Sequence, residues 1–259
     1  MTPDALEEAG LAVGLGAARA LPVAWLLPPF GGPHVPAQVR VALGLALAVL
    51  CLPVLTGQVP HAGPLVWILL LGREVAVGVT LGFVGSLVFR VAETAGRLTD
   101  ILRGANLAEV VNPISEERTS PLGDVTLLLA VVIFLELGGL GHVATALARS
   151  YEAVPVAASA RPAGFAQAAG LAITASAQML EAALGLAAPA LVALLLADLA
   201  LGAVGRVAPQ IPLYFVGMPL KALLGVGAVL VALGALDQTL TAGFQGWAGL
   251  LARAVAVWR

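Results

Sequence analysis

A polar island interrupts an otherwise apolar chain between Arg90 and Asp124. These 35 positions hold ten of the 28 charged residues of the sequence, and the stretches that flank them carry almost none. An apolar chain of this kind can form a lipid-facing bundle with no polar insert at all, so a long polar segment in its middle needs a reason. The pattern predicts a membrane protein whose functional loop lies in this island.

Composition sets the class of protein. The sequence has 60% hydrophobic and 11% charged residues and a mean hydropathy of +1.00, whereas water-exposed globular domains are about 25% charged. The 259 residues could form one large domain or two small ones. No Ser-rich or Pro-rich linker divides them, which favours one integral domain over residues 1–259. The net charge of −2 argues against a nucleic-acid partner.

Charge-poor stretches mark the expected helices, because a membrane-spanning helix needs about 20 apolar residues. Acidic residues occupy the N-terminus, where a cleaved secretory signal would carry Lys or Arg, so the first stretch is expected to remain in the mature protein. Prolines such as Pro53 and Pro60 turn the uncharged segment 41–72 into a hairpin, since each removes a backbone donor. Six or seven helices are predicted, over residues 9–27, 41–55, 64–89, 125–147, 162–197, 207–236 and 238–257.

Small residues and internal charges indicate helices that pack on protein. Gly78 and Gly82, like Gly10 and Gly14, lie four apart on one helical face, which permits close approach of two backbones. Ionisable side chains within the apolar stretches would each cost about 2–4 kcal/mol in hydrocarbon. Such side chains are expected to face a partner subunit, a wet lumen or one another. They are Arg73, Glu74, Glu136, Glu181, Asp198, Arg206 and Lys221.

No motif in the sequence carries catalysis. There is no Gly-rich phosphate loop, no Gly-x-Ser-x-Gly elbow, no His-Glu-x-x-His motif and no pair of cysteines. His34, His61 and His142 have no neighbouring Cys, Asp or Glu in ligand spacing, so neither a metal nor another cofactor is expected. Asp100 and Arg103 are three apart and can pair on one helical turn, which is ordinary electrostatics. An enzymatic function is not predicted.

Two blocks of the sequence resemble a known family. The island follows the pattern Gly-x-x-x-Asp-x-x-Arg-Gly-Ala from Gly96, then Asn-Pro at Asn112, then Ser-Pro-Leu-Gly from Ser120. A second block carries Asp198, Gly202, Arg206, Pro209, Gln210, Phe215, Pro219 and Lys221, and the first turn region carries Arg19, Pro29, Phe30, Pro36 and Arg40. Together these residues resemble the FliR/SctT family of type III export-apparatus proteins, and the resemblance covers most of the chain.

The resemblance implies an all-α, membrane-type bundle of kinked helical hairpins within a helical, pore-forming export gate. One copy of the family member joins several copies of two smaller membrane proteins, FliP/SctR-like and FliQ/SctS-like, beside other export-apparatus proteins. The gate passes unfolded protein substrates out of the cytoplasm. The implied location is the bacterial inner membrane, multi-pass, with the assembled complex displaced to the periplasmic side. The island, which hydropathy places in the cytoplasm, is then expected within the channel.

In this family the loop after the Arg-Gly-Ala motif lies in the channel and helps to plug it. The resemblance therefore implies a plug over about residues 104–121, with Asp100 and Arg103 as candidate anchors of its base. The candidate plug residues are Gly104, Ala105, Asn106, Asn112, Pro113, Ser115, Ser120 and Pro121. The second block is expected to be a broken helix that serves assembly, through Asp198, Arg206, Pro209, Gln210, Pro219 and Lys221.

The injectisome branch of the family is favoured over the flagellar protein FliR, because the Arg-Gly-Ala motif, the Ser-Pro-Leu-Gly run and Lys221 resemble it more. Asn112 stands where many relatives have Asp, although Asn-Pro starts a turn equally well. A small-solute or ion permease with internal acids as coupling sites is the alternative from another class. It would be expected to show inverted repeats, and no convincing repeat relates the two halves of the sequence.

Overall fold

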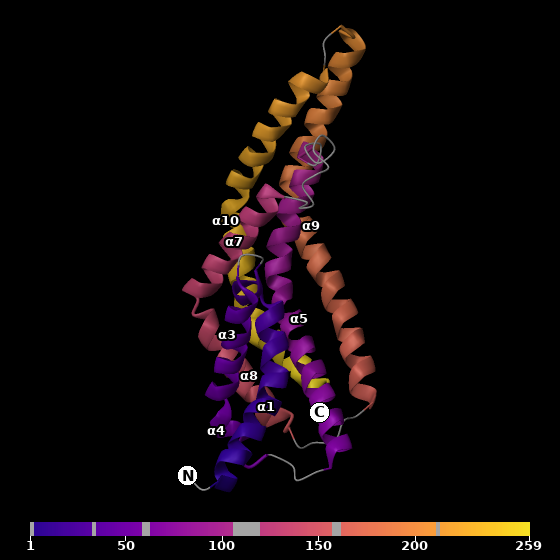
Figure 1. Ribbon diagram of the computed structural model, residues 1–259. Coiled ribbons are helices and arrows are strands. Elements are labelled where there is room, and N and C mark those ends of the chain that lie inside the picture. The colour runs from indigo at the N-terminus through magenta and orange to yellow at the C-terminus, as the bar shows by residue number, and fades with distance from the viewer. Residues whose placement is uncertain (1–2, 33–34, 59–62, 106–119, 157–161, 211–212) are drawn as a thin grey trace. The chain divides into compact units, whose positions relative to one another are not determined.

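The computed structural model describes residues 3–32, 35–58, 63–105, 120–156, 162–210 and 213–259. Every regular element in these ranges is a helix (Figure 1). Four helices are long and apolar enough to cross a membrane, or up to five spans if the bent pair α7 and α8 counts as one. The predicted class, an all-α bundle of the membrane type, is confirmed. In chain order the helices are α1 (Pro3–Leu26), α2 (Pro28–Gly31), α3 (Ala37–Leu50), α4 (Leu52–Leu55), α5 (Pro64–Arg103), α7 (Pro121–Glu136), α8 (Gly139–Ala153), α9 (Pro162–Val207) and α10 (Leu213–Ala256).

The helices divide into two compact units. Unit 1 comprises Met1–Leu87, Phe134–Ala177 and Phe244–Arg259, and unit 2 comprises Val88–Ile133 and Gln178–Gly243. The long helices α5, α9 and α10 therefore each contribute residues to both units. The single functional domain predicted for residues 1–259 stays a prediction.

Glycines bring helices of unit 1 into close contact. α1 packs along α3, and α5 approaches α1 so closely that a Cβ added to Gly78 would collide with the backbone carbonyl of Arg19. A Cβ added to Gly82, one turn further along, would lie 3.0 Å from atoms of α1. The predicted close approach at this pair is confirmed. At Gly10 and Gly14 an added Cβ would meet nothing within 4 Å, so no such approach exists there among the described residues.

α7 and α8 meet at a bend of 74°. Gly138 lies between them with φ +71°, in the left-handed region that glycine adopts without steric cost. Gly139 starts α8 against the ring of Phe134, where a side chain would collide. That ring packs on Phe244 and Trp247 of α10, with centroid distances of 5.4 and 5.7 Å. The single helix predicted for this stretch is therefore wrong, because the glycine pair ends α7 and starts α8 in a new direction.

Two long helices replace the last three predicted stretches. α9 has 46 residues and α10 has 44. The predicted boundary at Asp237 is wrong, because this one exposed charge lies inside α10 and does not end it. Pro22, Pro189 and Pro219 lie inside α1, α9 and α10 and end none of them. Each leaves a backbone acceptor without its usual N–H, which protein or water must satisfy.

The α9/α10 hairpin, defined as residues 178–210 and 213–243, forms much of unit 2, and Figure 1 shows its two arms side by side. Large apolar side chains remain exposed along both arms, among them Leu199, Leu223 and Val231, the last of them 88% exposed. Each arm has about 30 helical residues and is therefore about 45 Å long, whereas a bilayer core is roughly 30 Å thick. The hairpin thus leaves apolar side chains exposed, and each of its arms is longer than one bilayer crossing.

Candidate functional site

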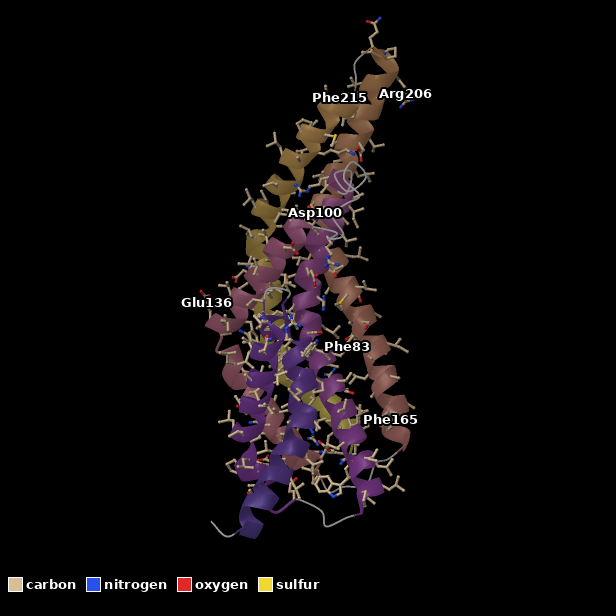
Figure 2. All side chains as sticks on the ribbon, viewed as in Figure 1. Phe83, Asp100, Glu136, Phe165, Arg206 and Phe215 are labelled. Carbon is tan, nitrogen blue, oxygen red and sulfur yellow. The ribbon has the colours of Figure 1, made fainter. Side chains whose placement is uncertain are left out.

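The end of α5 and the start of α7 meet in unit 2 at Asp100, which Figure 2 labels. Its side chain is 1% exposed. Arg103 Nε donates to Asp100 Oδ1 at 2.6 Å, and the Ser120 hydroxyl and the Leu122 backbone N–H donate to Oδ2 at 2.6 and 2.9 Å. A buried carboxylate requires charged or polar partners, and this one has three. Asp100 thus connects the residues on both sides of segment 106–119.

Gly104 ends α5 in the left-handed conformation, with φ +81°. The Ala105 N–H donates to the Asp100 carbonyl at 3.1 Å, and the Gly104 N–H donates to the Ile101 carbonyl at 3.2 Å. These are the paired hydrogen bonds of a Schellman C-cap, in which glycine avoids the penalty of a Cβ. The Arg-Gly-Ala motif therefore has a local role, because it ends the helix directly after Arg103.

Ser120 begins α7 as its N-cap. Its hydroxyl accepts a hydrogen bond from the Gly123 N–H at 3.3 Å, and its carbonyl accepts the Asp124 N–H at 2.8 Å. Pro121 follows at the first helical position, where the missing N–H costs nothing. Because the Ser120 hydroxyl also donates to Asp100, this residue, which was predicted to be part of the plug, lies in the anchor.

Close packing holds α5 against α7 beside the anchor. A Cβ added to Gly96 would lie 2.5 Å from the Leu122 carbonyl oxygen and 2.6 Å from Thr126 Oγ1. One added to Gly123 would lie 2.6 Å from the Ser120 hydroxyl. The buried Thr126 hydroxyl lies 2.8 Å from the Ala92 carbonyl and donates across the interface. The glycines of the sequence pattern therefore allow backbone contact between the two helices that carry the anchor.

Arg103 extends the anchor toward α10 within unit 2. Its side chain is 14% exposed, and a Cβ added to Gly225 of α10 would lie 3.1 Å from Arg103 Cδ. Two turns before Asp100 on α5, Glu93 pairs with Arg90 at 2.8 Å and with Arg97 at 2.6 Å. The predicted pairing of Asp100 with Arg103 is confirmed. The C-terminal turns of α5 thus hold a row of charges that are paired within the chain.

The second block lies in the α9/α10 hairpin. Asp198 of α9 and Lys221 of α10 form an ion pair between its arms. Arg206 lies in the last turn of α9 and is exposed, near the end of the hairpin where Figure 2 also labels Phe215. Pro209 and Gln210 follow α9 directly, while Pro219 lies inside α10. The structure brings two of these six residues together and leaves Arg206 without an ion pair to any described residue.

Four of the candidate plug residues lie outside the described ranges, namely Asn106, Asn112, Pro113 and Ser115. Gly104 and Ala105 lie at the end of α5, and Ser120 and Pro121 lie at the start of α7. The described part of the loop is therefore its base.

Arg19 lies at the centre of a buried charge cluster in unit 1. The sequence singled out Arg73 and Glu74 as charges that need partners, and these two do pair, but it did not predict that Arg19 joins them. The fully buried guanidinium donates to Glu74 Oε2 at 2.6 Å, to the Ser150 hydroxyl at 3.0 Å and to the Val154 carbonyl at 2.9 Å. It also lies 4.3 Å from the ring centroid of Tyr151, whose hydroxyl donates to the Gly16 carbonyl. An arginine in an apolar stretch signals a need for a partner, but only the fold selects Glu74 from the acids available.

Arg73 completes this cluster. It lies 3.4 Å from Glu74 Oε1 and donates to the Pro155 carbonyl at 3.1 Å. Both arginines thus bind carbonyl groups just after α8 while they share one carboxylate. Among the described residues, no three His, Cys, Asp or Glu side chains gather as metal ligands. These buried arginines thus fix the C-terminal end of α8 to α1 and α5.

The chain is similar in sequence to several proteins of bacterial secretion and flagellar systems. It is 33% identical over 153 residues to "Yop proteins translocation protein T" of Yersinia pestis, which covers 59% of this chain and 58% of that protein. It is 32% identical over 167 residues to "Secretion system apparatus protein SsaT" of Salmonella typhimurium, 64% of this chain and 63% of that one. The match to "Flagellar biosynthetic protein FliR" of Bacillus subtilis is 26% over 195 residues, 75% of each.

The first of these alignments thus spans less than two thirds of the relative's length. The family model described as "Bacterial export proteins, family 1" matches residues 11–247, which include α5, the Asp100 anchor and most of α10. That match extends over nearly the whole chain and contains both blocks of the sequence resemblance. This chain belongs to the family of bacterial export proteins, family 1.

Proposed function

We propose that this chain is a structural, non-enzymatic subunit of the type III protein-secretion export gate, where it lines and plugs the channel through which unfolded proteins leave the cytoplasm. Membership of the bacterial export family supports the proposal. So do relatives named for Yop protein translocation, for a secretion system apparatus and for flagellar biosynthesis. In this proposal residues 1–259 act as one export-gate domain.

The hydrogen bonds of Asp100 are the main support for the proposed plug. One buried carboxylate binds Arg103 before the loop and both Ser120 and Leu122 after it. The described residues on either side of segment 106–119 are thereby held at one point. Such a closed base suits a loop that moves as one body. The loop, residues 104–121, closes the pore at rest and is displaced by substrate.

The injectisome type is the favoured form of the gate. The relatives named for Yop translocation and for a secretion system apparatus are 33% and 32% identical. Two proteins named FliR, from Bacillus subtilis and Pectobacterium carotovorum, are 26% and 28% identical. The higher identity to the first group supports this choice, and a flagellar role is the alternative.

The α9/α10 hairpin supports the proposed partners. Its exposed apolar side chains need a cover of lipid or protein, and its arms are longer than one bilayer crossing. Several copies of two smaller gate proteins, FliP/SctR-like and FliQ/SctS-like, would supply that cover in the inner membrane or displaced to its periplasmic side. Pro209, Gln210 and Pro219 would shape the hairpin for this contact.

Deletion of residues 111–118 tests the plug. The deletion spares the described base of the loop, so the gate should still assemble, and the reconstituted complex should conduct small ions at rest more than the unchanged complex does. Planar-bilayer conductance measures the leak, and co-purification of the partner subunits serves as the control for assembly. Unchanged conductance in a normally assembled complex contradicts the plug and leaves family membership untouched.

Replacement of Arg206 by Ala tests the assembly role of the hairpin end. Arg206 is exposed and forms no ion pair with a described residue, so the isolated chain should fold as before. Co-purification of the smaller gate proteins should fall. If assembly stays normal and secretion alone fails, Arg206 serves the channel instead.

A further inference from the structure

A groove lies between α8 and the last turns of α10, both in unit 1. The cavity has a volume of about 500 Å³. One face of α8 lines it at helical spacing, from His142 through Ala146 to Ala153, and Ala248 and Ala252 line it from α10. Because alanine side chains are short, the two helices leave room between them along this seam.

A second cavity continues the groove. It has a volume of about 280 Å³ and shares His142 and Ala248 with the first. Its other walls include Phe134, Leu137 and Phe244, near the bend between α7 and α8. The two cavities therefore adjoin at these shared residues, and most of the residues that line the second cavity are apolar.

The strongest charges of the groove belong to the C-terminal turns of both helices. Arg149 and Glu152 lie in the last turns of α8, and Arg259 follows α10. Both arginines are exposed, and neither forms an ion pair with Glu152 or with any other described residue. Two guanidinium groups, those of Arg149 and Arg259, thus lie at this end of the groove beside the side-chain carboxylate of Glu152. Guanidinium groups with free donors bind phosphate oxygens in bidentate geometry.

The surroundings of the groove are those of a membrane. α10 is apolar and long enough to span a bilayer, and α8 is half of the bent pair that qualifies as a broken span. Arginines near the end of such helices extend to the headgroup level of the bilayer. Basic pockets between membrane helices recognise anionic lipid head groups. The groove thus offers a cationic end and an apolar seam to a molecule that has an anionic head and a long apolar tail.

We propose that the groove between α8 and α10 binds an anionic phospholipid, with its phosphate at Arg149 and Arg259 and one acyl chain along the alanine-lined and aromatic-lined seam. The site is separate from the Asp100 anchor, and it would exist whether or not the loop plugs a channel. A lipid wedged between the two helices would fix the C-terminal turns of α10 against α8.

Lipid retention by the purified full-length chain tests the charged end. The chain is reconstituted in vesicles of phosphatidylcholine alone or of equimolar phosphatidylcholine and phosphatidylglycerol, extracted in mild detergent and weighed by native mass spectrometry. Phosphatidylglycerol should be retained in preference to phosphatidylcholine. The double variant Arg149→Gln/Arg259→Gln should weaken the apparent affinity for phosphatidylglycerol by about fivefold for each arginine. Arg253→Gln should leave it unchanged, since Arg253 is exposed on α10 but does not line the groove.

The apolar seam has its own matched pair of variants. Ala252→Phe fills the groove, whereas Ala256→Phe adds the same side chain to an exposed position of α10 outside it. Only the first should lower phosphatidylglycerol retention. All five substituted positions are exposed, so the unfolding midpoint in detergent should change little and serves as the folding control.

Three results would overturn the proposal. Equal phosphatidylglycerol retention by the double arginine variant and by Arg253→Gln removes the headgroup contact. Displacement of the bound lipid by inorganic phosphate, with no effect of Ala252→Phe, identifies a simple anion site without an acyl chain. A normal lipid profile for Ala252→Phe combined with loss of co-purified gate subunits identifies the groove as a protein-binding surface.

Discussion

In unit 1 the Arg19–Glu74 pair has no exposed surface, whereas the Asp198–Lys221 pair in the α9/α10 hairpin leaves 42% of the Asp198 side chain and 23% of the Lys221 side chain exposed. Arg19 also binds Ser150 and the carbonyl after α8. The hairpin pair has no third partner among the described residues. The buried charges of unit 1 are paired with other residues of that unit. The two charges of the hairpin pair remain partly exposed to solvent.

Packing differs in the same direction. Gly78 of α5 touches the backbone of α1, and Ala20 and Val77 of these two helices are fully buried. In the hairpin, by contrast, Leu223 is 74% exposed and Val231 is 88% exposed. Burial and satisfied charges supply the stability of a chain, while exposed apolar surface supplies interaction area. Unit 1 therefore has the packing of a stable core, whereas the hairpin has apolar surface that remains free for contact.

Glu74→Gln should have the largest effect, because it removes the carboxylate that pairs with Arg19, and both side chains of this pair are fully buried. Breaking a buried ion pair by removing one partner costs about 3–5 kcal/mol of unfolding free energy. Unfolding in mixed detergent micelles measures the loss. Glu136→Gln, at an exposed position of α7, is the matched control and should change little. A loss as small as the control's would mean that unit 1 does not depend on the cluster.

Asp100→Asn should have the next effect. The amide cannot accept at both positions, so one of the Leu122 N–H, the Ser120 hydroxyl or Arg103 loses its bond. The expected cost is about 1–3 kcal/mol, the penalty for a buried group left unsatisfied. The same unfolding measurement applies.

Glu93→Gln is the control for Asp100. Glu93 is also nearly buried, but its partners Arg90 and Arg97 are 51% and 54% exposed. Ion pairs with exposed partners contribute about 0–1 kcal/mol. Equal losses for the two variants would show that the Asp100 contacts across the loop add nothing beyond an ordinary helical pair.

Gly78→Ala tests the packing half of the comparison. The new methyl group would collide with the Arg19 carbonyl, and overpacking of this kind costs about 1–3 kcal/mol. Gly14→Ala is the matched control, since Gly14 lies in α1 with open space around its Cβ position. There the alanine should stabilise the helix by about 0.5–1 kcal/mol. Opposite signs are expected in the detergent unfolding assay, and a loss at both positions would refute the packing argument.

The sequence predicted what depends on neighbouring residues. An apolar composition with charge-poor stretches indicated an all-α membrane bundle. The i, i+3 spacing of Asp100 and Arg103 indicated their pair, and the Gly78 and Gly82 spacing indicated close helix approach. Each of these rests on one helical turn or on composition, so no knowledge of the tertiary fold was needed.

Contacts between distant residues could not be predicted in this way. Glu74 lies 55 positions from Arg19, and Ser150 lies 131 positions from it, so any of several acids could have been the partner. Helix ends were also misplaced at Asp237 and at the α7–α8 bend. A single charge in a long apolar helix costs less than ending the helix, whereas the Gly138–Gly139 pair ended one that hydropathy would continue. Local polarity therefore predicted helix content better than helix limits.

Asp198→Asn should have the smallest effect on stability, because both members of its ion pair are partly exposed and solvent screens their attraction. The expected change in the unfolding free energy of the isolated chain is about 0–1 kcal/mol. If the hairpin serves contact with other subunits, the same substitution should lower co-purification of the smaller gate proteins more than it lowers stability, since subunit contact would desolvate the pair and leave Lys221 without its anion. Lys221→Met/Asp198→Leu removes both charges and should restore part of the co-purification. A loss of stability as large as that of Glu74→Gln would show that the hairpin pair is buried in the chain as it exists in the membrane, and would remove the distinction between the two regions.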